Sequence, residues 1–174
     1  KNFRFGKKRL GNIKTLKNFE KQYLYKTLVT TPYKKRDKIV SSSLIRKIIQ
    51  KGKIQEAEKL LGRPWSVEGE VIKGKQRGRK IGFPTCNIRL NPYTLPKLGV
   101  YSVLVQIENQ KKRGIANIGY RPTFNGKTLL LEVNIFGINR NLYKKILKIS
   151  FLKFIRAEKK FKNISQLKSQ IKKD

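Results

Sequence analysis

The chain has 174 residues, and its 43 Lys and Arg against 10 Asp and Glu give a formal charge of +33. It contains no His and one Cys, which excludes an imidazole base, a zinc site of the Cys/His type and an internal disulfide. The apolar share of 38% is still compatible with a packed core, so we expect one compact domain with an appendage. No apolar run approaches the length of about 20 residues that spans a membrane, and we expect a cytoplasmic protein without a membrane partner.

The positive charge allows two interpretations. Clustered Lys and Arg neutralise phosphates, so the chain could be a basic RNA- or ribosome-associated β-barrel protein without catalysis. Alternatively, most of these residues form a solvated surface. Lysines outnumber arginines 31 to 12, whereas recognition of base edges favours Arg. We therefore expect no specific nucleic-acid partner.

Residues 1–62 show a change from poor periodicity to clear helical spacing. Residues 1–40 are basic and rich in turn signals. Ser41 to Ser43 then supply hydroxyls that can cap a helix, whose apolar face consists of Leu44, Ile45, Ile48 and Ile49. A second short helix over 54–61 ends at Gly62. The two helices form a short helical segment between an N-terminal part and the rest of the chain.

From Trp65 onward the apolar period changes from 3.6 to 2, which is typical of half-buried strands. The alternation appears over residues 65–71, 101–107, 129–135 and 146–155, and residues 114–118 form another short strand. Asn125-Gly126 predicts a two-residue hairpin turn. Strands without intervening helices favour an antiparallel barrel or sandwich. A final helix is expected after Asn163.

The segment 73–82 contains three glycines and five cations directly after a predicted strand. Glycines let backbone N–H groups approach a ligand closely, and the cations favour an anion, so phosphate binding is one interpretation. The segment lacks the Gly-Lys-Ser/Thr of a Walker loop, and no helix is predicted after it. An ordinary basic loop fits the composition equally well.

Thr85 and Asn87 follow this loop and lie on one face of an extended segment. Their neutral oxygens suit Mg²⁺ when a substrate's phosphates supply the negative charge. The alternative is that both side chains satisfy a turn. Cys86 points the other way and is interpreted as a small core residue.

Glu132 is the carboxylate that stands in the middle of an otherwise apolar strand, between Leu131 and Val133. A carboxylate there is costly unless it is paired or faces a polar cavity. In a chain without His, Glu132 is therefore the candidate general base. The alternative is an exposed outer face, which would also place Leu130 and Phe136 in water.

The stretches 74–87, 99–101, 117–124, 131–133 and 151–161 resemble the riboflavin kinase family, and more closely the C-terminal half of the bacterial bifunctional riboflavin kinase/FMN adenylyltransferase (FAD synthetase). The resemblance implies a mainly β fold, a six-stranded antiparallel Greek-key barrel with a C-terminal helix. It also implies transfer of the ATP γ-phosphoryl group to the 5′-hydroxyl of riboflavin, which gives FMN, with Mg²⁺ as cofactor. By motif, Glu132 would be the catalytic base. The other implied site residues are Gly74, Arg79, Gly82, Thr85 and Asn87 for ATP, Thr85 and Asn87 for the metal, and Arg156, Glu158 and Phe161 for the flavin.

The N-terminal part resembles the closing stretch of the family's adenylyltransferase domain, through residues 3–11 and 41–46. We therefore predict an incomplete α/β remnant over residues 1–58 and a riboflavin kinase domain over 59–174. The catalytic His-x-Gly-His motif of the adenylyltransferase is expected upstream, so this chain is not expected to make FAD. Apolar surface on the remnant would allow self-association.

Overall fold

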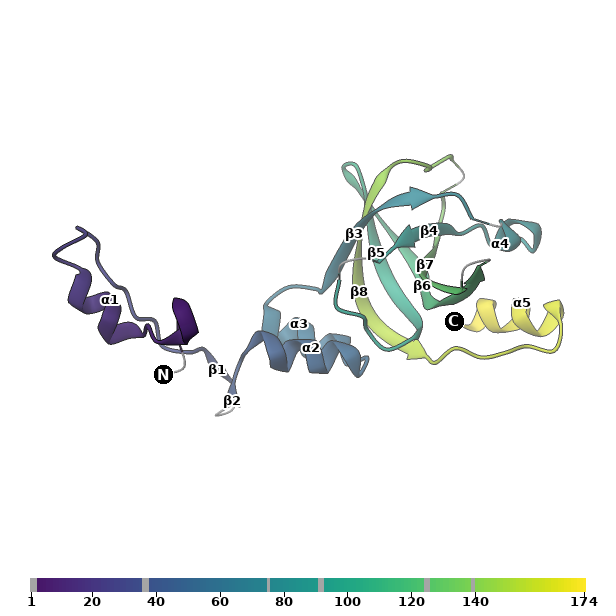
Figure 1. Cartoon of the computed structure of the whole chain (residues 1–174). Helices are drawn as coiled ribbons and strands as arrows, with labels where there is room; N and C mark the ends of the chain where they lie inside the picture. Colours follow the sequence, from purple (N-terminus) through teal and green to yellow (C-terminus); the bar gives the residue numbers. More distant parts are fainter. Residues whose placement is uncertain (1–2, 36–37, 75, 91–92, 124–125, 139) are drawn as a thin grey trace. The chain divides into compact units, whose positions relative to one another are not determined.

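The computed structural model describes residues 3–35, 38–74, 76–90, 93–123, 126–138 and 140–174 (Figure 1). The chain divides into two compact units, Lys1–Val40 and Ser41–Asp174. This division reflects which residues contact one another. The boundary predicted after residue 58 separates two family domains, and it stays a prediction.

The first unit holds η1 (Lys7–Arg9), α1 (Ile13–Phe19) and the paired two-residue strands β1 (Lys34–Lys35) and β2 (Lys38–Ile39). Asn12 caps α1 through a capping box with Thr15. None of the unit's residues with a described side chain is buried. Its exposed apolar side chains include Phe19, Tyr23, Leu24, Leu28 and Val29.

The second unit begins with the predicted pair of helices, α2 (Ser42–Gln50) and α3 (Ile54–Leu61). The Ser41 hydroxyl accepts a hydrogen bond from Leu44 N at 3.2 Å, and α3 ends at Gly62 in the left-handed conformation. Both predicted ends of the helical segment are thus confirmed.

Six antiparallel strands close into a barrel in the order β3-β4-β7-β6-β5-β8. Their bounds are β3 (Ser66–Ile72), β4 (Cys86–Arg89), β5 (Gly99–Ile107), β6 (Gln110–Thr123), β7 (Gly126–Ile135) and β8 (Ile146–Arg156). Strands β5, β6 and β7 follow one another as hairpins, and β8 returns to lie beside β5, which is the Greek-key arrangement. The chain ends with α5 (Ile164–Lys173), capped by Asn163. The predicted barrel and C-terminal helix are confirmed.

Two turns refine the sequence predictions. Thr123 pairs with Gly126, which confirms a hairpin between β6 and β7, although Asn125 itself lies outside the described residues. The glycine loop contains one helical turn, α4 (Arg77–Lys80), where the sequence predicted no helix. Four residues cannot show an apolar period of 3.6, so this turn leaves no trace in the sequence pattern.

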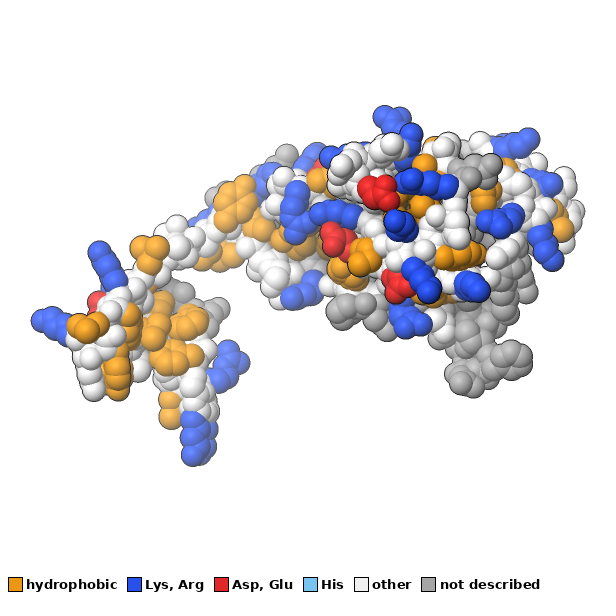
Figure 2. Space-filling model, turned by 90° about the horizontal axis from the view of Figure 1, so that it is seen from above, with side chains coloured by type: hydrophobic (Ala, Val, Ile, Leu, Met, Phe, Trp, Pro, Cys, Tyr) orange, Lys and Arg blue, Asp and Glu red, His pale blue; other side chains and the backbone are white. Residues whose placement is uncertain are grey.

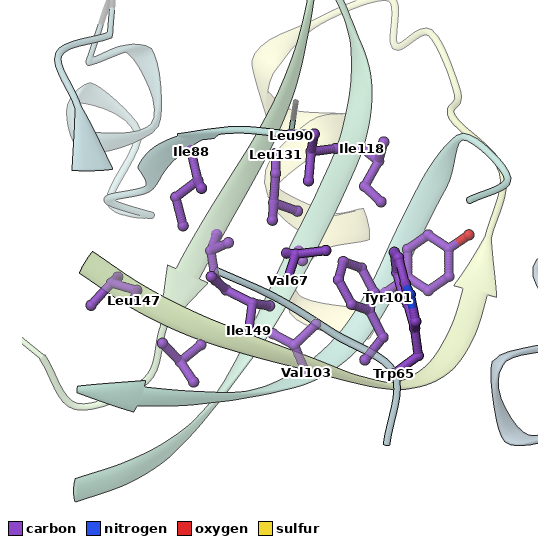
Figure 3. Packing of buried hydrophobic residues seen from close by; sticks show 14 of the residues in the cluster. Trp65, Val67, Ile88, Leu90, Tyr101, Val103, Ile118, Leu131, Leu147 and Ile149 are labelled. Atoms are coloured by element: carbon purple, nitrogen blue, oxygen red, sulfur yellow. The ribbon is translucent and has the colours of Figure 1, made fainter. Parts of the chain in front are cut away.

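The barrel interior is filled by every second residue of the strands (Figure 3). Leu131 and Val133 of β7, Ile118 of β6 and Ile88 of β4 have no exposed surface. Phe151 packs between Trp65 and Tyr101, with ring centroids 4.8 and 5.2 Å away. Burial of each side chain of this size stabilises the fold by about 1.5–3 kcal/mol. The residues between them must therefore point to the outer face.

Lys and Arg side chains are spread over the face seen in Figure 2, with some Asp and Glu among them. Within the described part of the chain, no helix is both long and apolar enough to cross a membrane.

Candidate active site

The glycine loop between β3 and β4 folds directly onto the segment that holds Thr85 and Asn87. A Cβ on Gly74 would lie 1.8 Å from the amide nitrogen of Asn87. A Cβ on Gly78 would lie 2.3 Å from the carbonyl oxygen of Phe83 and 3.3 Å from the Thr85 hydroxyl. The loop backbone therefore approaches these two side chains as closely as only glycine allows.

A pocket beside this contact is lined from two sides. Arg79, Thr85 and Cys86 contribute from the glycine loop and the start of β4. Arg140 and Tyr143 contribute from the segment that connects β7 to β8. The amide nitrogen of Gln76 donates a hydrogen bond to the Tyr143 hydroxyl at 3.1 Å, which links the two walls. The rest of the lining is largely apolar (Val71, Pro84, Ile135, Ile138 and Leu142), and the two arginines and the Thr85 hydroxyl are groups in it that could bind a phosphate oxygen.

The polar residues on the outer face form a row across three strands. Asn87 of β4 and Asn117 of β6 are both direct cross-strand partners of Glu132 on β7. Cross-strand partners share a face of the sheet and lie about 4.5–5.5 Å apart. Glu132 therefore stands between two amide side chains, opposite in sense to the buried Leu131 and Val133.

The alternative considered for Glu132, a fully solvated outer face, does not fit the structure. Glu132 is half-buried, Asn87 is 8% exposed, and Leu130 is half-buried as well. Phe136, at the end of the strand, is exposed. The glycine loop covers the row at Asn87, and the segment after β8 covers it at Asn117.

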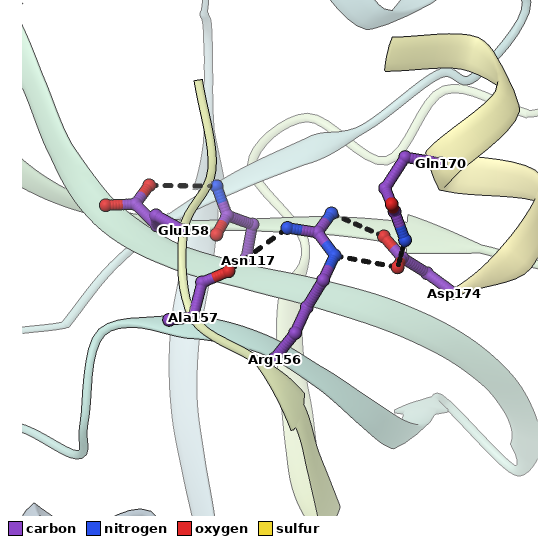
Figure 4. A network of polar contacts seen from close by, with 6 residues as sticks. All are labelled: Asn117, Arg156, Ala157, Glu158, Gln170 and Asp174. Atoms are coloured by element: carbon purple, nitrogen blue, oxygen red, sulfur yellow. Dashed lines mark hydrogen bonds and ion pairs between the residues drawn. The ribbon is translucent and has the colours of Figure 1, made fainter. Parts of the chain in front are cut away.

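Two of the predicted flavin residues, Arg156 and Glu158, lie at the Asn117 end of the row (Figure 4). The Asn117 amide donates a hydrogen bond to Glu158 at 3.3 Å. A Cβ on Gly119 would lie 2.1 Å from the same carboxylate, which shows how closely Glu158 packs on β6. Arg156 lies over the ring of Phe161 at 5.8 Å, and Phe161 lines a groove along α5.

Arg156 is held by the last residue of the chain, Asp174 (Figure 4). Its guanidinium donates two hydrogen bonds to the Asp174 carboxylate, at 2.8 and 2.5 Å, and one to the carbonyl oxygen of Ala157 at 3.1 Å. Burial alone would raise the pKa of the Asp174 carboxyl, but the hydrogen bonds from Arg156 and Gln170 and the charge of Arg156 lower it overall. The pair ties the end of α5 to the end of β8.

Cys86, between Thr85 and Asn87, is half-buried against the barrel core, as expected. Burial raises the pKa of its thiol, so the thiol is protonated and unreactive at neutral pH.

The structure brings several of the predicted residues close together around β4, β7 and β6. Gly74, Thr85 and Asn87 meet at one end, Arg79 lines the adjoining pocket, Glu132 lies in the centre, and Glu158 lies at the other end. Gly82 takes the left-handed conformation at the end of α4, with φ of 87°, and so shapes the loop. Sequence reasoning did not identify Asn117, Tyr143 or Asp174 as site residues. Their positions depend on strand register and on contacts between segments far apart in the chain.

A basic glycine loop, two neutral oxygens and a carboxylate on the outside of a Greek-key barrel are together suited to a phosphotransferase acting on a small molecule. A model of the riboflavin kinase family (flavokinase) matches residues 61–174, so the chain belongs to that family. The family's reaction is the ATP-dependent phosphorylation of riboflavin to FMN. The resemblance seen in the sequence is confirmed.

Relatives and a solved structure extend this match over nearly the whole chain. The bifunctional riboflavin kinase/FMN adenylyltransferases of Buchnera aphidicola subsp. Schizaphis graminum and of Bacillus subtilis are 44% and 41% identical to it. Each alignment covers 99% of the chain but 56% and 55% of the relative. A crystal structure described as a macrolide-efflux protein from Streptococcus pneumoniae is 37% identical, with a TM-score of 0.84, over 99% of this chain and 56% of that one. The chain thus spans about half the length of the proteins it matches.

Proposed function

We propose that this chain transfers the γ-phosphoryl group of ATP to the 5′-hydroxyl of riboflavin, with Mg²⁺, and releases FMN and ADP. The observation that supports this most directly is the polar row across β4, β7 and β6. It places Glu132 between the Thr85–Asn87 end, suited to a nucleotide, and the Glu158 end, where two of the predicted flavin residues lie.

The nucleotide end has the parts that phosphoryl transfer requires. Arg79 and the backbone of the glycine loop would bind phosphate oxygens and neutralise their charge. The Thr85 hydroxyl and the Asn87 amide oxygen would be ligands of Mg²⁺, whose remaining ligands come from phosphates and water. In the described part of the chain no three acidic, His or Cys side chains gather into a metal site. Bound to Thr85 and Asn87, Mg²⁺ would neutralise the charge that develops on the phosphates.

Glu132 would act on the acceptor. The proton of the 5′-hydroxyl passes to the Glu132 carboxylate while the hydroxyl oxygen forms its bond to the γ-phosphorus. The bond between that phosphorus and the oxygen bridging it to the β-phosphate breaks, and ADP leaves with the electron pair.

The flavin end would bind the rest of the acceptor. Phe161 offers an aromatic face in the groove along α5, and Arg156 and Glu158 offer a guanidinium and a carboxylate. Arg156 is already held in place by Asp174, so its orientation is fixed before a ligand arrives.

Substitution Glu132→Gln tests the proposal, because it keeps the shape of the side chain and removes the base. We expect kcat to fall by about 10²–10⁴-fold, while riboflavin and ATP bind as before. The assay measures FMN formed from riboflavin, MgATP and a reductant. Glu70→Gln, an exposed carboxylate on β3, is the matched control and should retain full activity. Full turnover in the Glu132 variant, or no FMN from the unaltered chain, would refute the proposal. A basic RNA-binding barrel would not respond to Glu132→Gln.

The second activity of the bifunctional relatives is not proposed for this chain. Its 174 residues contain no His, and the resemblance places the catalytic His-x-Gly-His motif in a part of the adenylyltransferase domain that these residues do not include. FAD formed from FMN and ATP by this chain would contradict this. We also propose that the first unit can mediate self-association, through the exposed apolar side chains of residues 3–35.

A further inference from the structure

One polar atom in the row lacks a hydrogen bond. The amide oxygen of Asn117, Oδ1, is shielded from solvent and accepts no hydrogen bond from the residues that the structure describes. The nitrogen of the same amide donates to the Glu158 carboxylate at 3.3 Å. A buried acceptor left without a donor costs free energy, so the site is incomplete as it stands.

The orientation of the amide follows from its neighbour. If the amide were turned over, its oxygen would face the Glu158 carboxylate, and two acceptors would meet without a proton between them. Glu158 is itself confined, because its carboxylate occupies the space where any side chain at position 119 would begin. The donor side of Asn117 is thus fixed on Glu158, and its acceptor side has no donor among the described residues.

That acceptor lies next to the candidate base. Asn117 and Glu132 are direct cross-strand partners, so their side chains project from the same outer face about 4.5–5.5 Å apart at the backbone. A chain of hydroxyl groups that presents one hydroxyl to Glu132 can present a neighbouring hydroxyl to Asn117 Oδ1. A hydroxyl is the donor that such an acceptor needs.

We propose that Asn117 binds a hydroxyl of the ribityl chain close to the reacting 5′ end, and that it selects acceptors carrying a polyol. This inference rests on the proposed function and deepens it, since it assigns a specificity residue to the same site. The bound hydroxyl donates to Oδ1 and fixes the position of the 5′-hydroxyl beside Glu132. Asn117 is therefore a binding residue, and it takes no proton in the reaction.

Riboflavin analogues that each lack one hydroxyl test the proposal on the unaltered chain. Binding is measured by the quenching of flavin fluorescence, without turnover. We expect the 4′-deoxy or the 3′-deoxy compound to bind about 10-fold or more weakly than riboflavin, because it leaves Asn117 unpaired. If the 2′-deoxy, 3′-deoxy and 4′-deoxy compounds all bind as riboflavin does, a water molecule satisfies Oδ1 and the proposal is wrong.

The variant Asn117→Leu provides the second arm, because it keeps much of the shape and removes the acceptor. We expect riboflavin binding to weaken about 10-fold and the preference over the deoxy compound to disappear, while KM for ATP stays unchanged. Asn109→Leu, in the exposed turn between β5 and β6, is the control for loss of an unrelated amide. An undiminished preference in Asn117→Leu would overturn the proposal.

The two proposals fail in different ways. Failure of the kinase function would appear as no FMN and no riboflavin binding in the unaltered chain. Failure of the Asn117 inference would leave an active kinase that does not distinguish riboflavin from its deoxy analogues.

Discussion

Substitution of Gly74 by Ala tests whether the contact between the glycine loop and Asn87 forms the nucleotide site. The added Cβ would lie 1.8 Å from the Asn87 amide nitrogen, so the two must separate by about 1.6 Å to reach an ordinary contact of 3.4 Å. Asn87 is 8% exposed and has little room to yield. Overpacking of this kind costs about 1–3 kcal/mol. A misplacement of about 1 Å in a catalytic site lowers the rate by up to about 100-fold.

We therefore expect kcat/KM for ATP in Gly74→Ala to fall about 10–100-fold, whichever of the loop and the amide moves. Riboflavin binding, measured by fluorescence quenching, should change less than about twofold, because the predicted flavin residues lie beyond Glu132. Steady-state FMN formation at varied MgATP measures the effect. Unchanged ATP kinetics in a folded variant would refute the assignment of Asn87 and the loop to the nucleotide.

Gly62→Ala is the matched control, because it strains the backbone without pressing the new Cβ against any neighbouring atom. Gly62 has φ of 71° and open space around its Cβ position, at the end of α3. A left-handed Ala costs about 1–2 kcal/mol, so this variant should lose stability and keep its ATP kinetics. The two alanine variants thus separate a loss of stability from a loss of the site.

Two further predictions concern stability. Phe151 is fully buried between Trp65 and Tyr101. Its replacement by Ala should lower the free energy of unfolding by about 3–5 kcal/mol. A chemical denaturation midpoint close to that of the unaltered protein would contradict this. Asp174→Asn should lower the free energy of unfolding by about 1.5–3 kcal/mol at neutral pH, because the Asp174 carboxylate accepts two hydrogen bonds from Arg156. Since the folded-state pKa of Asp174 lies below the ordinary 3.8, this stabilisation is complete above that value and is lost as the pH falls through the folded pKa. Denaturation of the unaltered protein and of Asp174→Asn across pH 2–7 measures the difference in their free energies of unfolding. A difference that does not narrow at low pH would exclude the ion pair as its cause.

Most of the barrel could be predicted because its strands have one face in the core. Val67 to Val71, Leu131 to Ile135 and Leu147 to Phe151 alternate at period 2, and the structure buries the expected members. The short strand β4 was harder to predict. Both Asn87 and Ile88 are buried there, because the glycine loop covers the outer face. A strand covered on both sides loses the alternation on which the sequence argument depends.

The sequence proposed several residues of the candidate site, but it did not predict how they are arranged in space. Local spacing placed Thr85 beside Asn87 and singled out Glu132. That Glu132 stands between Asn87 and Asn117 follows from the registers of β4 and β6 against β7, which no local pattern contains. The same limit applies to Asp174, which reaches Arg156 from the far end of α5.

The period of two also makes the barrel core and the candidate active site depend on each other. Leu131 and Val133 point inward because they are apolar, and that choice forces Glu132 outward into the row with the two amides. A slip of one residue in the pairing of β7 would carry Glu132 into the core and Leu131 to the surface, at a cost of several kcal/mol. The strong preference of the core for one register therefore fixes the position of Glu132, the proposed base, and no separate interaction is needed to hold that register.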